Sequence, residues 1–240
     1  MTRLAWTAPA LLPLALMSLA LGASPSARAD SANDLPPPNT VRVGLYDVMY
    51  HVHAEDLSGP YVPPGVGLDV QDIQTLYVAY VREFFYHLDV ELALGVPPLT
   101  KTEGRGPAKL GSVPYNGQII STARWLAPSL VANYVFLSPQ HALRPYIGVG
   151  INYTSFYDRN STAMGNAASG GPTRLSLSSS VGPVGTVGLT YRFDRRWALF
   201  ASYSLSEVQT NLVANTAGVI RTTHVSFAPG ALIVAAGFSF

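Results

Sequence analysis

The chain has 240 residues and a nearly balanced charge, since 15 Lys and Arg oppose 14 Asp and Glu, and charged residues make up only 12% of it. The sequence contains no basic patch or charge run, which excludes the nucleic-acid-binding class. Cysteine is absent, which excludes a disulfide framework and a thiolate metal site, although an exported protein could have used disulfides.

Residues 1–29 are predicted to be a cleaved signal peptide. Arg3 precedes an apolar run from Leu4 to Leu21, and Ala27-Arg28-Ala29 then forms a site of the small-x-small type. We expect cleavage after Ala29. An uncleaved anchor is the less favoured alternative, because prolines interrupt the apolar run. Removing this segment takes away Arg3 and Arg28 and leaves the mature chain close to neutral.

The remainder is predicted to be an outer-membrane β-barrel preceded by a short lead. Residues 30–40 contain Leu35-Pro36-Pro37-Pro38, a stiff extended spacer expected on the periplasmic side. Past the signal no apolar run approaches the ~20 residues that a spanning helix needs. A moderately hydrophobic exported chain of this kind favours a barrel, in which half of each strand is polar. Residues 41–240 therefore predict an eight-stranded antiparallel transmembrane β-barrel in the bacterial outer membrane.

Eight segments show strand patterns. They are expected to be joined by short periplasmic turns at Arg82-Glu83, at 138–143 and at Asp194, and by long outer loops over residues 55–69, 97–122, 158–172 and 211–218. The predicted strands cover residues 41–52, 70–81, 84–96, 123–137, 144–157, 173–193, 195–209 and about 219–240.

The third predicted strand carries two carboxylates on its inner face. Asp89 and Glu91 alternate with the apolar Leu88, Val90 and Leu92. Carboxylates are costly in lipid but tolerable in a lumen where a cation can pair with them. Arg42, Arg82 and Arg124 are candidate partners. Paired carboxylates could also do acid/base work, but a structural salt bridge is the favoured interpretation.

The fourth strand contains Pro128, and the sixth contains Pro183. Proline removes a ladder donor, so it is expected at an edge, a bulge or a gap. A closed barrel has no edge, so Pro128 should mark a local break in the wall. Pro183 is a second candidate break.

The inner faces of the later strands suggest a narrow, partly apolar channel. The inner set leans apolar, although Asn152 joins Asp89 and Glu91 as a polar lumen residue. Alternation in the last strand places Phe240 and Phe238 on the lipid side, and a soluble β-sandwich strand is the alternative for this segment. The candidate channel residues are Tyr146, Gly148, Gly150, Phe200 and Ile233.

Aromatic residues are expected in two interfacial girdles, one near the turns with Trp197, Tyr191, Tyr134, Phe136, Tyr86, Phe84 and Phe240, and one near the loops with Tyr153, Tyr157 and Tyr50.

Several segments resemble the OmpW family of small outer-membrane barrels, the OmpW/AlkL-like proteins. The fifth strand, LRPYIGVGINY at 143–153, carries the family motif in full, and two departures are a single proline at Ala127-Pro128 and the unexpected Pro183. Further matches are VRVGLY at 41–46, DVELALGVPP at 89–98, APSLVANYVF at 127–136, VGLTYRFDRRW at 187–197 and FAPGALIVAAGFSF at 227–240.

The resemblance implies a function. Small hydrophobic molecules would enter the barrel from outside and leave sideways into the membrane through a gap that we expect near Pro128. Such a barrel has no cofactor and is not an enzyme. Its expected partners are outer-membrane lipids, the hydrophobic solutes and the barrel assembly machinery, which would recognise the terminal Phe240.

Three alternatives remain open. A structural or adhesive barrel would have a lumen plugged by charged pairs. A barrel hydrolase acting on lipid A could use His224 and Ser226, which share a strand face but lack an orienting acid. His51 and His53 share a face and could bind a metal ion, although polarity at the rim is the favoured explanation.

Overall fold

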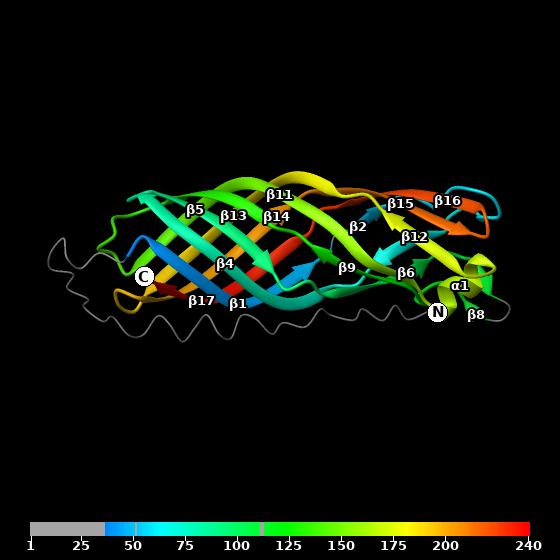
Figure 1. Ribbon diagram of the computed structural model, residues 1–240, viewed down its shortest axis with the longest axis horizontal. Helices are drawn as coiled ribbons and strands as arrows, with labels where there is room; N and C mark the ends of the chain where they lie inside the picture. Colours follow the sequence, from blue (N-terminus) through cyan, green and yellow to red (C-terminus); the bar gives the residue numbers. More distant parts are fainter. Residues whose placement is uncertain (1–36, 51, 111–112) are drawn as a thin grey trace, which may run out of the picture.

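The computed structural model describes residues 37–50, 52–110 and 113–240, so the predicted signal peptide, the lead up to residue 36 and His51 lie outside the described residues. Among those described, eight antiparallel strands close into a barrel, because each strand pairs with two neighbours and β10 pairs with β11 (Figure 1). This confirms the predicted fold class. The ring consists of β1 (Asn39–Met49), β4 (Ile73–Phe85), β5 (Leu88–Gly95), β10 (Ser129–Val135), β11 (Leu143–Ser161), β13 (Ser180–Arg192), β14 (Trp197–Ser206) and β17 (Gly230–Ser239).

Side chains alternate between lipid and lumen along each of these strands. In β17, Ile233 and Ala235 are buried in the lumen, whereas the intervening Val234 is 46% exposed. In β11, Ile147, Val149 and Ile151 form the outward face. Within the ladders, strand pairing satisfies the backbone groups inside a bilayer, and the exterior that meets the lipid is apolar.

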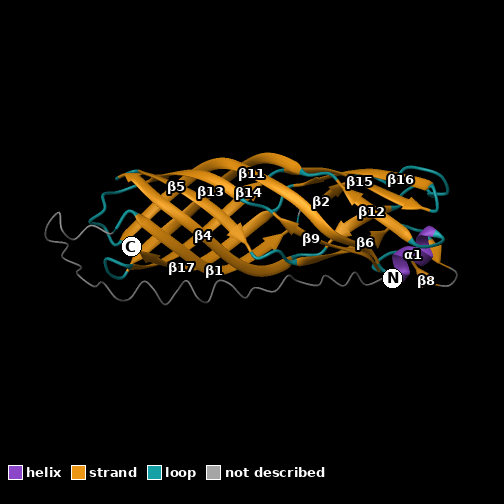
Figure 2. Ribbon diagram, viewed as in Figure 1, coloured by secondary structure: helices purple, strands orange, loops and turns teal. Residues whose placement is uncertain are grey.

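The outer loops contain more regular structure than the sequence indicated. Hairpins continue the ladders beyond the barrel, and irregular segments such as residues 55–66 connect them (Figure 2). The added elements are β2 (Val52–Ala54), β3 (Gly67–Val70), β6 (Leu99–Arg105), β7 (Lys109–Leu110), β8 (Val113–Pro114), β9 (Ile119–Leu126), α1 (Ala163–Ser169), β12 (Thr173–Leu177), β15 (Val208–Thr216) and β16 (Val219–Phe227).

Beside the two-stranded pair β7–β8, two larger outer sheets result, one with the order β12-β15-β16-β2 and one built from β3, β6, β9 and the outer part of β11. A buried cluster that includes Leu68, Ile120 and Leu212 joins them. No helix among the described residues is both long and apolar enough to cross a bilayer.

Three local expectations were wrong. The turn between the second and third barrel strands lies at Tyr86-His87, because Arg82 and Glu83 still pair across the ladder with Val90 and Asp89. β13 runs unbroken through Pro183, whose carbonyl accepts from Glu207 N where the β13–β14 ladder has already ended. A missing donor costs little at that point.

Tyr50 does not belong to the outer aromatic girdle. Its ring packs edge-on against Phe227, and both residues line an internal cavity. The lipid-facing Tyr153 and Tyr157 do lie at that level, and both are more than 40% exposed.

Candidate functional site

The predicted lumen residues all face the interior, but they form two different groups. Tyr146, Phe200, Asp89 and Glu91 are buried in the half of the barrel nearer the turns. Gly148 and Gly150 contribute no side chain there, because a Cβ at either position would meet atoms of β10. These residues surround a packed obstruction rather than an open channel.

A charged plug fills this half of the lumen, and we define it as Arg42, Tyr77, Glu91, Tyr146 and Phe200. Arg42 Nη1 lies 2.5 Å from Glu91 Oε2, and Tyr77 donates its hydroxyl hydrogen to the same carboxylate. The Arg42 guanidinium also lies over the Phe200 ring, 3.8 Å from its centroid, and 5.7 Å from the centroid of Tyr146. A buried cation paired and stacked in this way has little freedom to move aside.

Of the three arginines proposed as partners of Asp89 and Glu91, only Arg42 forms an ion pair with one of them. Arg82 lies over the ring of Phe84, with its guanidinium carbon 5.6 Å from the centroid. Arg124 pairs with Asp158, 3.3 Å away. Asp89 instead accepts a 2.7 Å hydrogen bond from the Asn133 amide.

Asn152 is bonded elsewhere and holds the chain beside Pro128. Its Nδ2 donates to Ser129 Oγ at 2.8 Å and to the carbonyl of Ala127 at 3.2 Å. Pro128 itself lies between β9 and β10, which splits the predicted fourth strand. The side chain of Asn152 therefore supplies hydrogen bonds at the place where proline interrupts the ladder.

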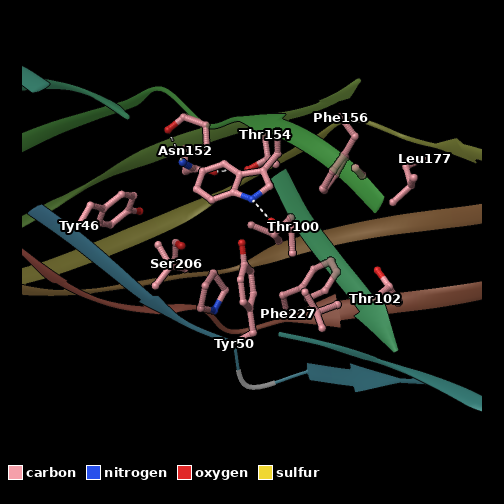
Figure 3. A pocket seen from close by; sticks show the side chains of 17 residues that line it. Tyr46, Tyr50, Thr100, Thr102, Asn152, Thr154, Phe156, Leu177, Ser206 and Phe227 are labelled. Atoms are coloured by element: carbon pink, nitrogen blue, oxygen red, sulfur yellow. Dashed lines mark hydrogen bonds between the residues drawn. The ribbon is translucent and has the colours of Figure 1, made fainter. Parts of the chain in front are cut away.

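An aromatic chamber with a cavity volume of about 80 Å³ lies on the outer side of the plug. Trp125 donates its indole hydrogen to Thr100 Oγ1 at 2.9 Å, which fixes the ring against one wall. Figure 3 shows the labelled side chains converging on one space from strands on both sides of the barrel. The aromatic members of the lining are Tyr46, Tyr50, Trp125, Phe156 and Phe227.

This chamber was not predicted from the sequence. Trp125, Phe156 and Phe227 continue the inward alternation of Val131, Asn152 and Ile233 along the same segments of the chain, so all three side chains face the interior. Trp125 lies two residues before Ala127-Pro128, and Phe227 lies two before Pro229. The available signal was this unbroken alternation, which runs past Pro128 and Pro229 to an aromatic residue on the outer side of each proline.

The wall beside the chamber has an unpaired stretch. The β5–β10 ladder ends at Ala93↔Ser129, and the β6–β9 ladder resumes at Leu99↔Arg124. Residues 94–98 and 125–128, which we call the unpaired stretch, therefore form no ladder with each other. Leu94, Gly95 and Ala127 line a second cavity of about 40 Å³ between the plug and the chamber.

The geometry around His224 does not support the hydrolase hypothesis. His224 Nδ1 lies 2.9 Å from the amide oxygen of Asn211, rather than beside a carboxylate. His51 lies outside the described residues, so the His51/His53 hypothesis stays a prediction. Within the described ranges, no three His, Cys, Asp or Glu residues come close enough to hold a metal ion.

Comparison with known proteins identifies the family. The sequence profile of the OmpW family matches residues 40–240. The chain belongs to the OmpW family. Outer membrane protein W of Salmonella typhimurium is 31% identical over 146 residues, which cover 58% of this chain and 68% of that protein.

Two further likenesses agree with membership in the OmpW family. DoxH, a dibenzothiophene metabolism operon protein of a Pseudomonas species, is 29% identical over 50% of this chain and 54% of its own. The crystal structure of the outer membrane protein OprG from Pseudomonas aeruginosa superposes with a TM-score of 0.77 at 19% identity, covering 86% of this chain and 97% of OprG. At that identity the superposition shows the fold alone. This OmpW-family chain is thus an outer-membrane β-barrel, as expected.

Proposed function

We propose that this OmpW-family barrel carries small hydrophobic molecules across the outer membrane and releases them sideways into the bilayer. The observation that carries the proposal is the position of the aromatic chamber, which lies between the charged plug and the outer sheets and beside the unpaired stretch. The name of the DoxH relative, which refers to an aromatic sulfur heterocycle, is compatible with this class of solute.

Sideways release follows from the barrier below the chamber. An apolar solute in the chamber would have to displace the Arg42–Glu91 pair to reach the periplasmic end. Separating a buried ion pair leaves uncompensated charges in a low dielectric, which is costly. Movement toward Leu94 and Ala127 separates no buried ion pair, and the backbone there has no ladder partner across the stretch.

Pro128 is the proposed site of this opening. It separates β9 from β10, and Pro97, whose carbonyl points across the stretch to Arg124, supplies no backbone N–H on that edge. A wall with fewer hydrogen bonds to break can part at a lower free-energy cost. The carbonyl of Pro128 accepts a hydrogen bond from Tyr153 N at 3.0 Å. The edge of this segment that faces β11 therefore stays bonded.

The plug favours a second candidate, a structural or adhesive barrel through which nothing passes. The two functions differ in the role of the chamber, since an adhesive barrel has no need of an open apolar cavity inside its wall. Neither function needs a catalytic group, and we assign none to His224 or Ser226.

Uptake of a radiolabelled aromatic hydrocarbon by cells that lack the native protein tests the proposal. Cells expressing the chain should accumulate the tracer faster than cells with an empty vector. Phe156→Asp, which places a carboxylate in the chamber, should abolish the gain. Trp197→Ala, which removes a lipid-facing aromatic residue of similar size, is the matched control and should preserve it. Equal uptake with and without the protein would contradict the proposal and favour the adhesive barrel.

We also propose that the barrel assembly machinery recognises β17 through Phe240. Phe240 is 55% exposed on the lipid side and its backbone N donates to Asn39 O, which closes the ring onto the first strand. Phe240→Ala should lower the amount of heat-modifiable barrel in the outer membrane. The control Phe136→Ala removes an exposed aromatic residue on a different strand and should leave assembly intact.

A further inference from the structure

The outer end of the unpaired stretch is marked by Arg124. It faces outward, because its neighbours Ala123 and Trp125 both line the chamber. It pairs with Leu99 on one side and with Tyr157 on the other, and both of these side chains are exposed toward lipid. Arg124 thus lies at the level of the outer aromatic residues, where the two sides of the unpaired stretch pair again as β6 and β9.

The guanidinium of Arg124 contacts Pro97 on one neighbouring segment and Asp158 on the other, so it links three adjacent segments of the wall. Arg124 Nη1 donates to the carbonyl of Pro97 at 3.1 Å, across the stretch where the backbone makes no ladder bonds. Arg124 Nε lies 3.3 Å from Asp158 Oδ2 on β11. A planar fork with several donors can serve both partners in one conformation, which a single ammonium group cannot do.

An irregularity in β11 directs the Asp158 side chain toward Arg124. Asp158 has a φ of +49°, and the β11–β9 register shifts between Tyr157 and Asn160. Asn160 Nδ2 donates to Asp158 Oδ1 at 3.0 Å, which steadies the carboxylate. Bulges of this kind turn a side chain away from the regular pleat, and a positive φ in a non-glycine residue persists only where its surroundings favour it.

We propose that Arg124 is a latch that sets the width of the opening in the wall. This inference rests on the proposed function and adds a positioning residue to it. The Arg124–Pro97 bond replaces the missing ladder bonds at the outer end of the unpaired stretch, and the Asp158 carboxylate holds the guanidinium in place. Ion pairs that are partly exposed stabilise a structure only modestly, so the latch can open and close without unfolding the barrel.

Spin labels across the stretch test the latch directly, without any transport measurement. The chain has no cysteine, so Val96→Cys and Leu126→Cys introduce the only two labelling sites, both facing lipid. With Arg124 present, the dipolar broadening should report a narrow distribution of distances between the two spin labels. Arg124→Ala should lengthen or broaden it. Arg124→Lys should do the same, because the charge remains but the two-armed contact is lost. Arg174→Ala, on β12, is the control and should change nothing.

Uptake then connects the latch with passage. Arg124→Ala and Arg124→Lys should raise the uptake of a bulky polycyclic solute about threefold relative to a narrow one, the rate change expected from loss of one partly exposed charged contact. An unchanged spin–spin distance in Arg124→Ala, or a native distance in Arg124→Lys, overturns the latch whatever the uptake shows. A widened stretch with no protein-dependent uptake supports the latch and contradicts the proposed function.

Discussion

Replacing Arg42 with methionine tests the plug most directly. Methionine keeps much of the volume of the arginine stem but removes the cation from the Glu91 carboxylate and from the Phe200 ring. The side chains of Arg42 and Glu91 are only 5% and 11% exposed, so little solvent reaches a carboxylate left without its partner. Breaking a buried pair in this way costs about 3–5 kcal/mol.

A double variant separates the charge effect from packing. Arg42→Met combined with Glu91→Gln leaves no unpaired charge, and the new amide oxygen can still accept from Tyr77. The double variant should therefore be more stable than Arg42→Met alone, and the two single losses should fail to add.

Urea unfolding of the detergent-solubilised barrel, followed by tryptophan fluorescence and by the heat-dependent gel shift, measures these free energies of unfolding. A loss below about 1 kcal/mol for Arg42→Met would refute the reasoning, because it would mean that water already solvates Glu91. Additive losses within about 0.5 kcal/mol would refute the direct coupling of the two side chains.

Three further predictions concern other parts of the barrel. Gly237→Val should destabilise the barrel by about 1–3 kcal/mol in the same unfolding assay, because a side chain there meets the Phe200 ring. In a Trp197→Phe background, Trp125 emission should change on adding an aromatic hydrocarbon, since Trp125 lines the chamber. Backbone N–H groups of Arg196 and Trp197 lower the pKa of Asp194 below its ordinary value of 3.8, so its contribution to stability is complete above pH 3.8 and is lost as the pH falls below it. An NMR titration of this carboxyl measures the shift.

Each of these has a control. Gly185→Val faces open space outside the barrel and should change the free energy of unfolding by less than about 0.5 kcal/mol. A comparable loss would show that strand propensity, not the Phe200 contact, sets the effect at Gly237. Unaltered Trp125 emission at saturating hydrocarbon would place the binding site elsewhere. A normal pKa for Asp194 would mean that its turn is open in solution.

The sequence alone determined the barrel. Alternation with a period of two, as in Ile147, Val149 and Ile151, directly encodes which face meets lipid, because strand geometry leaves no other assignment. The even number of strands and the segments resembling one family followed from the same local pattern. Carboxylates at Asp89 and Glu91 likewise had to face inward, since lipid does not tolerate them.

Only the tertiary structure decided what fills the ring. Arg42, Arg82 and Arg124 are equivalent as sequence letters, yet one lies in the plug, one over Phe84 and one beside Asp158. Their partners come from strands far apart in the chain, and the choice depends on the register with which the ring closes. The chamber was hidden for the same reason. Its aromatic lining comes from strands on opposite sides of the barrel, and alternation shows that each side chain faces inward but not which of them meet in one space, because that depends on the register of the ring.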